Sequence, residues 1–143
     1  MGFIATAVLV ATSTFAQEPC KESDQFAAFF HRFSDDASFQ KSRLWESVRY
    51  GAWRLDHGKR VLQWQEMSPT QVLASPSGRV IPTTADQAKL YIVKTSPAQN
   101  GRVDVNVVRD EADSFDSTFS FRAIIGCWML EEIRDNYFDA DGV

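Results

Sequence analysis

The chain has 143 residues and a formal net charge of −4, with 15 Lys and Arg against 19 Asp and Glu. Its basic residues are not clustered, which argues against a nucleic-acid partner because phosphate binding depends on clustered Lys and Arg. The 11 Phe and four Trp are spread along one domain's length without a linker or repeat. We therefore expect one hydrophobic core and no extended disorder.

The N-terminal segment predicts export. Residues 3–11 are apolar and uncharged, and they are fewer than the roughly 20 residues that cross a bilayer. Thr14 and Ala16 place small residues at the −3 and −1 positions of a signal-peptidase site. We assign residues 1–16 to a signal peptide and residues 17–143 to one mature domain. The usual Lys or Arg before the apolar run is missing, which indicates a misassigned start codon or a weak export signal. A buried N-terminal strand or helix is the alternative to a signal peptide.

The two cysteines, Cys20 and Cys127, lie near opposite ends of the mature chain. In an oxidising compartment a cysteine pair is more often a disulfide than a metal site. We therefore predict a bond between them. Pro19, directly before Cys20, does not fit a lipoprotein signal. We expect a soluble periplasmic protein without a membrane anchor.

The first half begins with two helices and continues as a hairpin. Phenylalanines at 26, 29, 30 and 33 follow the spacing of one helical face, and Ser23 can cap that helix. A second helix is expected to begin within residues 34–36 and to end near Arg43. Alternation from Leu44 predicts a strand, a turn at residues 56–59 and a return strand over residues 61–65. A short helical turn over residues 70–74 follows Ser68 and Pro69, and a loop covers residues 75–78.

The second half has the pattern of an antiparallel sheet. Strands are predicted over residues 90–93 and 103–107, joined by a turn at Asn100 and Gly101. After an acidic stretch, residues 119–125 and 128–133 give the last two strands. The fold class is α+β, with the N-terminal helices packed on one face of a curved antiparallel sheet.

Two motifs carry a resemblance to a known superfamily. The run Phe26-x-x-Phe29-Phe30-x-x-Phe33-x-x-Asp36-x-x-Phe39-Gln40-x-x-Arg43 is similar to the opening of a family of small exported bacterial proteins in the nuclear transport factor 2-like superfamily. Trp128-x-Leu130-x-x-Ile133 resembles the last strand of that superfamily. The resemblance implies a cone-shaped α+β roll, often with a pocket inside. It implies no single function, because the superfamily includes isomerases, dehydratases, small-molecule binders, dimeric scaffolds and toxin-neutralising immunity proteins.

Four residues of the first motif are assigned structural roles: Asp36, Phe39, Gln40 and Arg43. Asp36 and Arg43 are predicted to form an ion pair that fixes the second helix, with substrate binding as the alternative. Gln40 is expected to satisfy buried backbone groups at the same corner.

Catalytic and metal-binding signatures are not found in the sequence. His31 and His57 stand alone, without the spacing of a metal site, and no cofactor is expected. An enzyme would need a general base such as Asp104 and a proton donor such as Tyr50 or Tyr91 inside the cone. Asp104 alternates with valines and is better explained as part of a solvated sheet face. We therefore expect a protein that is not an enzyme.

The predicted hairpin is the candidate binding surface. It concentrates amphipathic aromatic and guanidinium groups of the kind found at the centre of protein interfaces. Packing in the core is the alternative role for its tryptophans. Asp110 and Glu111 are expected to steer a basic partner towards it. The proposed partner-binding residues of the hairpin are Arg49, Tyr50, Trp53, Arg54 and His57.

Together these features favour a periplasmic binding protein. Its concrete form would be an immunity protein that neutralises a secreted antibacterial toxin by stoichiometric binding, a task that needs a stable scaffold but no chemistry. Two alternatives remain open: a small-molecule binder or isomerase-like enzyme that uses the cone pocket, and a homodimeric scaffold.

Overall fold

The computed structural model describes residues 20–21, 24–109 and 115–137. The predicted signal peptide, the capping residue Ser23, and Asp110 and Glu111 lie outside these residues. The elements, in chain order, are α1 (Phe26–Asp35), α2 (Ala37–Ser42), β1 (Leu44–Asp56), β2 (Lys59–Met67), α3 (Pro69–Val72), α4 (Thr84–Leu90), β3 (Tyr91–Thr95), β4 (Arg102–Arg109), β5 (Asp116–Ile124) and β6 (Cys127–Asp135).

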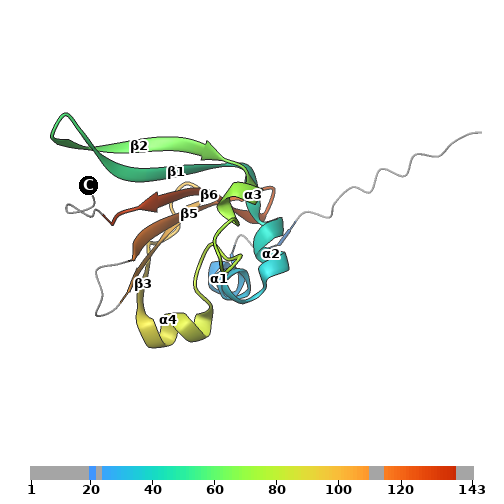
Figure 1. Cartoon of the computed structure of the whole chain (residues 1–143). Helices are drawn as coiled ribbons and strands as arrows, with labels where there is room; N and C mark the ends of the chain where they lie inside the picture. The colour runs from blue at the N-terminus through green and yellow to red at the C-terminus, as the bar shows by residue number, and fades with distance from the viewer. Residues whose placement is uncertain (1–19, 22–23, 110–114, 138–143) are drawn as a thin grey trace, which may run out of the picture.

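The six strands form one curved, open sheet in the order β2-β1-β6-β5-β4-β3. Figure 1 shows the sheet bent around α1 and α4, with the β1–β2 hairpin along its upper side. The prediction of an α+β fold with N-terminal helices on a curved sheet is confirmed. One pair differs from the expected antiparallel arrangement, since β1 runs parallel to β6. Residue alternation is the same in both kinds of pair, so the sequence pattern could not distinguish them.

The phenylalanine stripe of α1 packs on the concave face of the sheet. Phe29 and Phe33 are buried, and the ring of Phe33 meets that of Phe121 on β5 edge-to-face at 5.2 Å. Phe26 makes a similar contact with Trp128 on β6, at 5.1 Å. The predicted core role of the stripe is therefore confirmed. Such aromatic pairs add about 0.5–1.5 kcal/mol to the gain from burying their area.

The corner between α1 and α2 is held by backbone contacts. The Asp36 carboxylate caps α2 by accepting from the backbone N–H of Phe39 at 2.9 Å. Gln40, which is fully buried, donates to the carbonyl of Phe33 at 3.0 Å and accepts from the N–H of Val80 at 2.8 Å. The structural role predicted for Gln40 is thus confirmed.

The expected ion pair between Asp36 and Arg43 is not formed. The Asp36 carboxylate lies 3.8 Å from the Nε of Arg32, one helical turn away. The Arg43 guanidinium lies over the ring of Phe39, 4.8 Å from its centroid, and Nη2 donates to Cys20 Sγ at 3.4 Å. Because α2 ends at Ser42, Arg43 leaves the helix and turns towards the disulfide, away from the helix start.

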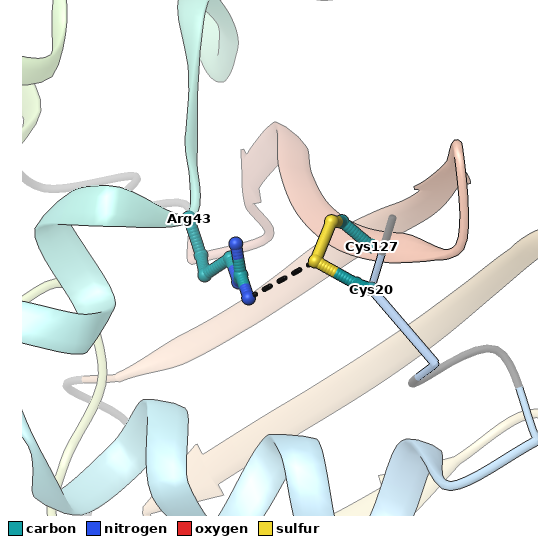
Figure 2. The surroundings of a disulfide bond; sticks show 3 residues. All are labelled: Cys20, Arg43 and Cys127. Atoms are coloured by element: carbon teal, nitrogen blue, oxygen red, sulfur yellow. Dashed lines mark hydrogen bonds between the residues drawn. A yellow bond between two sulfur atoms is a disulfide. The ribbon is translucent and has the colours of Figure 1, made fainter. Parts of the chain in front are cut away.

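The disulfide between Cys20 and Cys127 is formed, as predicted. Figure 2 shows Arg43 pointing at its sulfur atoms. The bond joins the residues before α1 to the first residue of β6. Gly126, with φ +75°, allows this approach, because a Cβ at that position would overlap the carbonyl oxygen of Cys20.

The structure corrects several element boundaries and adds one helix. Helix α4 was not predicted; Thr83 caps it by accepting from the N–H of Asp86 at 3.2 Å. Leu90, expected in a strand, is the last residue of that helix. Strand β5 begins at Asp116, and Ile125, expected at its end, lies in the turn to β6 with φ 49°. The helical turn α3 begins and ends slightly earlier than predicted.

Candidate functional site

A cavity of about 520 Å³ opens on the concave side of the sheet. One wall is made by strand residues and the other by the segment from the end of β2 to α4. Tyr91 and Phe115, whose rings meet edge-to-face at 5.5 Å, line it together with Phe119 and Ile133. A pocket with apolar walls and a few polar groups is the usual form of a small-molecule site.

The polar groups of this cavity include Tyr50 and Asp135. The Tyr50 hydroxyl donates to Oδ2 of Asp135 at 3.4 Å, and Oδ1 accepts from the backbone N–H of Tyr137 at 3.0 Å. Partial burial raises the pKa of Tyr50, and the neighbouring Asp135 carboxylate raises it further, against the opposing charge of Arg54. The phenol therefore remains a proton donor near neutral pH, and a hydrogen-bond donor and an acceptor lie side by side on the cavity wall.

Asp104, the candidate base of the enzyme alternative, lies on the opposite face of the sheet. The neighbouring residues Val103 and Val105 are buried in the core, so Asp104 points outward. Partial burial favours its neutral form, but hydrogen bonds from Ser120 and Arg102 and the charge of Arg102 outweigh this and lower the pKa of the Asp104 carboxyl. Asp104 is thus separated from Tyr50 and Tyr91, which do line the cavity. The carboxylate beside Tyr50 is Asp135, which lies two residues beyond the end of the strand predicted over residues 128–133.

A charged network covers the outer face around Arg102. Its guanidinium lies 2.9 Å from Asp104, 3.5 Å from Glu131 and 3.4 Å from Glu132. A register shift between Leu130 and Glu132 in the pairing of β6 with β5 places the two adjacent glutamates within reach of one arginine. The network was not predicted, because it depends on this irregularity. Its other ion pairs are Arg49–Glu132 and Arg122–Glu131.

The β1–β2 hairpin carries two stacked arginine–tryptophan pairs. Arg60 lies over Trp53, 4.3 Å from the ring centroid, and Arg49 lies over Trp64 at 4.5 Å. The Trp64 ring also lies flat against Gly51, where a Cβ would come within 2.7 Å of it. These contacts hold the flat side chains in place on a surface where Trp64 remains 38% exposed.

The structure divides the predicted partner-binding residues between two faces. Arg49 and Trp53 lie on the outer face, while Tyr50 and Arg54 alternate with them and face the concave side. His57 lies at the hairpin tip, where its ring is 95% exposed and contacts the Asp56 carboxylate at 2.6 Å. Arg60, which stacks on Trp53, was missed although it stands in the predicted hairpin.

Among residues 20–21, 24–109 and 115–137, no three His, Cys, Asp or Glu side chains gather as metal ligands. None of the helices within those ranges is long and apolar enough to cross a bilayer.

Comparison with known proteins gives a structural match but no sequence match. No protein-family profile matches the chain, and neither does any curated protein sequence. A nuclear transport factor 2-like protein from Bacteroides fragilis matches with a TM-score of 0.57 over 79% of this chain, at 16% identity. This chain therefore has a nuclear transport factor 2-like fold. It spans about half of that protein, covering 47% of its length.

A second similar structure is a nuclear transport factor 2-like protein of unknown function from Silicibacter pomeroyi. It has a TM-score of 0.46 and 12% identity, over 79% of this chain and 92% of that one. The fold expected from the two sequence motifs agrees with the Bacteroides match. At these identities the similarity is one of fold, and the function has to be argued from the surfaces of this chain.

Proposed function

We propose that this protein is an exported binding protein that acts in the periplasm, and that it neutralises a secreted antibacterial toxin by stoichiometric binding. In this role it is an immunity protein and needs no chemistry of its own. The toxin is proposed to dock on the outer face of the β1–β2 hairpin, at the end where Arg60 stacks on Trp53.

The observation that carries the proposal is the projecting end of the hairpin. Strand β1 pairs with β6 only as far as Ala52, opposite Asp135, whereas β1 and β2 remain paired as far as Asp56 and Lys59. The last part of the hairpin is therefore a two-stranded ribbon, and residues 54–60 on it are all exposed. It presents Trp53 under Arg60, together with Leu55, which is 58% exposed. Tryptophan and arginine dominate the centres of protein interfaces, and side chains already held in place lose less entropy on binding.

Export and charge support the same role. The Cys20–Cys127 disulfide is consistent with an oxidising compartment. The net charge of −4 suits a basic partner. Asp110 and Glu111, which lie outside the described residues, are proposed to speed the encounter with such a partner.

Purification of the tagged protein from periplasm of the producing bacterium tests this proposal. We expect one protein partner in a one-to-one complex, and growth arrest when that partner is expressed alone in the periplasm. Trp53→Ala should weaken the complex by at least about 1 kcal/mol and reduce rescue of growth. Trp45→Ala is the matched control, because Trp45 lies at the far end of β1 beside the charged network. Absence of a protein partner, with a metabolite bound instead, would contradict the proposal.

The cavity supports a second candidate function, the binding of a small molecule. Its specific observation is the contact between Tyr50 and Asp135 on a cavity wall that also carries Phe119 and Ile133. A ligand with a hydroxyl or amide group could bond to both side chains. Mass spectrometry of an organic extract of the native protein should then release one compound, which Tyr50→Phe should lose. An empty extract from the wild-type protein would dismiss this candidate.

A further inference from the structure

The outer edge of β2 is open. Strand β2 is the outermost strand of the sheet, as Figure 1 shows along its upper side. It pairs with β1 on one side, and no strand of the described ranges pairs with it on the other. Its nine residues, Lys59–Met67, contain neither Gly nor Pro. A long strand edge without such breaks is a template for pairing with another strand.

The turn of the hairpin determines which backbone groups point to that edge. His57 and Gly58, with φ of 49° and 75°, form a two-residue turn between Asp56 and Lys59, which are direct partners. In such a hairpin the closing residues exchange both hydrogen bonds, and every second pair does the same. The odd-numbered residues of β2 therefore bond to β1. The N–H and C=O groups directed to the open edge belong to Arg60, Leu62, Trp64 and Glu66.

We propose that β2 pairs antiparallel with β2 of a second copy of this chain, about a two-fold axis through Gln63. This register places Arg60 opposite Glu66 of the second copy, and Glu66 opposite the second copy's Arg60. It also places Leu62 opposite Trp64. All four are residues whose backbone groups point outward, so each pair can exchange two hydrogen bonds. The interface is the same patch on both copies, as two-fold symmetry requires.

Charge complementarity selects this register over its neighbours. A shift by two residues sets Arg60 opposite Trp64 or Glu66 opposite Leu62, and both cross-strand ion pairs are lost. A shift by one residue sets the backbone groups that point to the open edge opposite residues of the second copy whose backbone groups are already bonded to β1. Arg60, Trp64 and Glu66 are exposed in the single chain. The Arg60 stack on Trp53 and the bond from Ser47 to Glu66 hold both charges on the outer face.

The proposed pairing joins two six-stranded sheets into one continuous sheet. Its hydrogen bonds come from backbone groups at the edge of β2, so it does not involve the cavity. Arg60 is shared with the proposed docking surface, where it stacks on Trp53. Glu66→Arg therefore separates the two proposals, because it should break the dimer while Trp53 and Arg60 stay in place.

Sedimentation equilibrium of the oxidised chain at micromolar concentrations tests the pairing. We expect a concentration-dependent dimer. Arg60→Glu and Glu66→Arg should each weaken it at least tenfold, because like charges then face each other twice. An equimolar mixture of the two variants should restore a dimer, because each introduced charge meets its opposite in the mixed pair. This recovery cannot arise from misfolded chains.

Lys59→Glu is the matched control, because it makes the same change in charge as Arg60→Glu. In the proposed register Lys59 lies opposite Met67, so this variant should retain the dimer. A wild-type chain that stays monomeric would overturn the pairing. A dimer unaffected by Arg60→Glu and Glu66→Arg would place the interface elsewhere, and failure of the mixture to associate would exclude this register.

Discussion

Gly126 is subject to two separate restraints in the turn between β5 and β6. Its φ is +75°, and a Cβ would overlap the carbonyl oxygen of Cys20. We expect Gly126→Ala to lower the free energy of unfolding by about 2–3 kcal/mol, measured by urea denaturation. Gly78→Ala is the control, because Gly78 has φ +63° and no neighbouring atom within 4 Å. It should cost only about 1 kcal/mol. Equal losses in the two variants would show that the contact with Cys20 is unimportant.

The raised pKa of Tyr50 predicts that the free energy of unfolding depends on pH in the alkaline range. Its folded pKa is raised above the ordinary value of 10.0, chiefly by burial and then by Asp135. The folded state therefore holds this proton more tightly than the unfolded state does. The resulting stabilisation is fully present below about pH 10 and is lost as the pH rises through the folded pKa. Tyr50→Phe should flatten the alkaline fall in stability and remove from an ultraviolet titration a tyrosine that ionises above the ordinary pKa. An unchanged alkaline profile would contradict this assignment.

At the residue scale, sequence patterns predicted the role of a side chain better than the identity of its partner. Gln40 could be predicted because a polar side chain inside an apolar motif needs buried partners. The ion pair between Asp36 and Arg43 was wrong because α2 ends one residue earlier and Cys20 lies nearby. Asp135 could not be placed beside Tyr50 without the parallel pairing of β1 with β6.

The α1–α2 corner depends on Phe39. Its ring is 7% exposed and lies between the guanidinium groups of Arg32, at 4.1 Å, and Arg43, at 4.8 Å. We expect Phe39→Ala to lower the free energy of unfolding by about 3–5 kcal/mol, measured by urea denaturation. Arg43→Ala should also lower it. The folded molecules of both variants should bind the partner with the same affinity as the wild-type protein. Loss of affinity by Arg43→Ala at an unchanged melting temperature would reveal a binding role.

At the element scale, periodicity predicted α1 and every strand of the described residues, and capping signals predicted α2 and α3. Helix α4 was missed, although Thr83 and Asp86 offered a capping signal at the correct spacing. The helix has only seven residues, and its weak apolar pattern gave no helical period. The direction of β6 beside β1 was also missed. Strand order is set by packing of the whole sheet, whereas alternation reports only which side of a strand is buried.

The Cys20–Cys127 bond acts on the whole molecule, because it closes a loop with a sequence separation of 107. In the chain-entropy account a loop of this length gives about 4.7 kcal/mol of stabilisation, less any strain. Protein purified from periplasm should show no free thiol under denaturing conditions. The double variant Cys20→Ser/Cys127→Ser should lose several kcal/mol of unfolding free energy. Two free thiols in the periplasmic protein would contradict the account.

At the scale of the whole molecule, the sequence predicted fold class far better than function. Helices, strands and the disulfide follow from local patterns and from two cysteines. Alternation along β1 decides which face each side chain lies on, so it separates Arg49 and Trp53 from Tyr50 and Arg54. The strand also projects beyond its neighbour β6. How far β1 extends past β6 depends on where β6 ends, which no local pattern shows.

The central claim is that a partner protein docks on the projecting hairpin. A photo-crosslinking amino acid placed at Leu55, on the hairpin, tests it directly in periplasm of the producing bacterium. Ile92 on β3 is the control, because it is similarly exposed at 46% but lies on the opposite edge of the sheet. We predict one discrete protein adduct at Leu55 and none at Ile92. An adduct at Ile92 alone, or none at either position while a partner co-purifies, would contradict the claim.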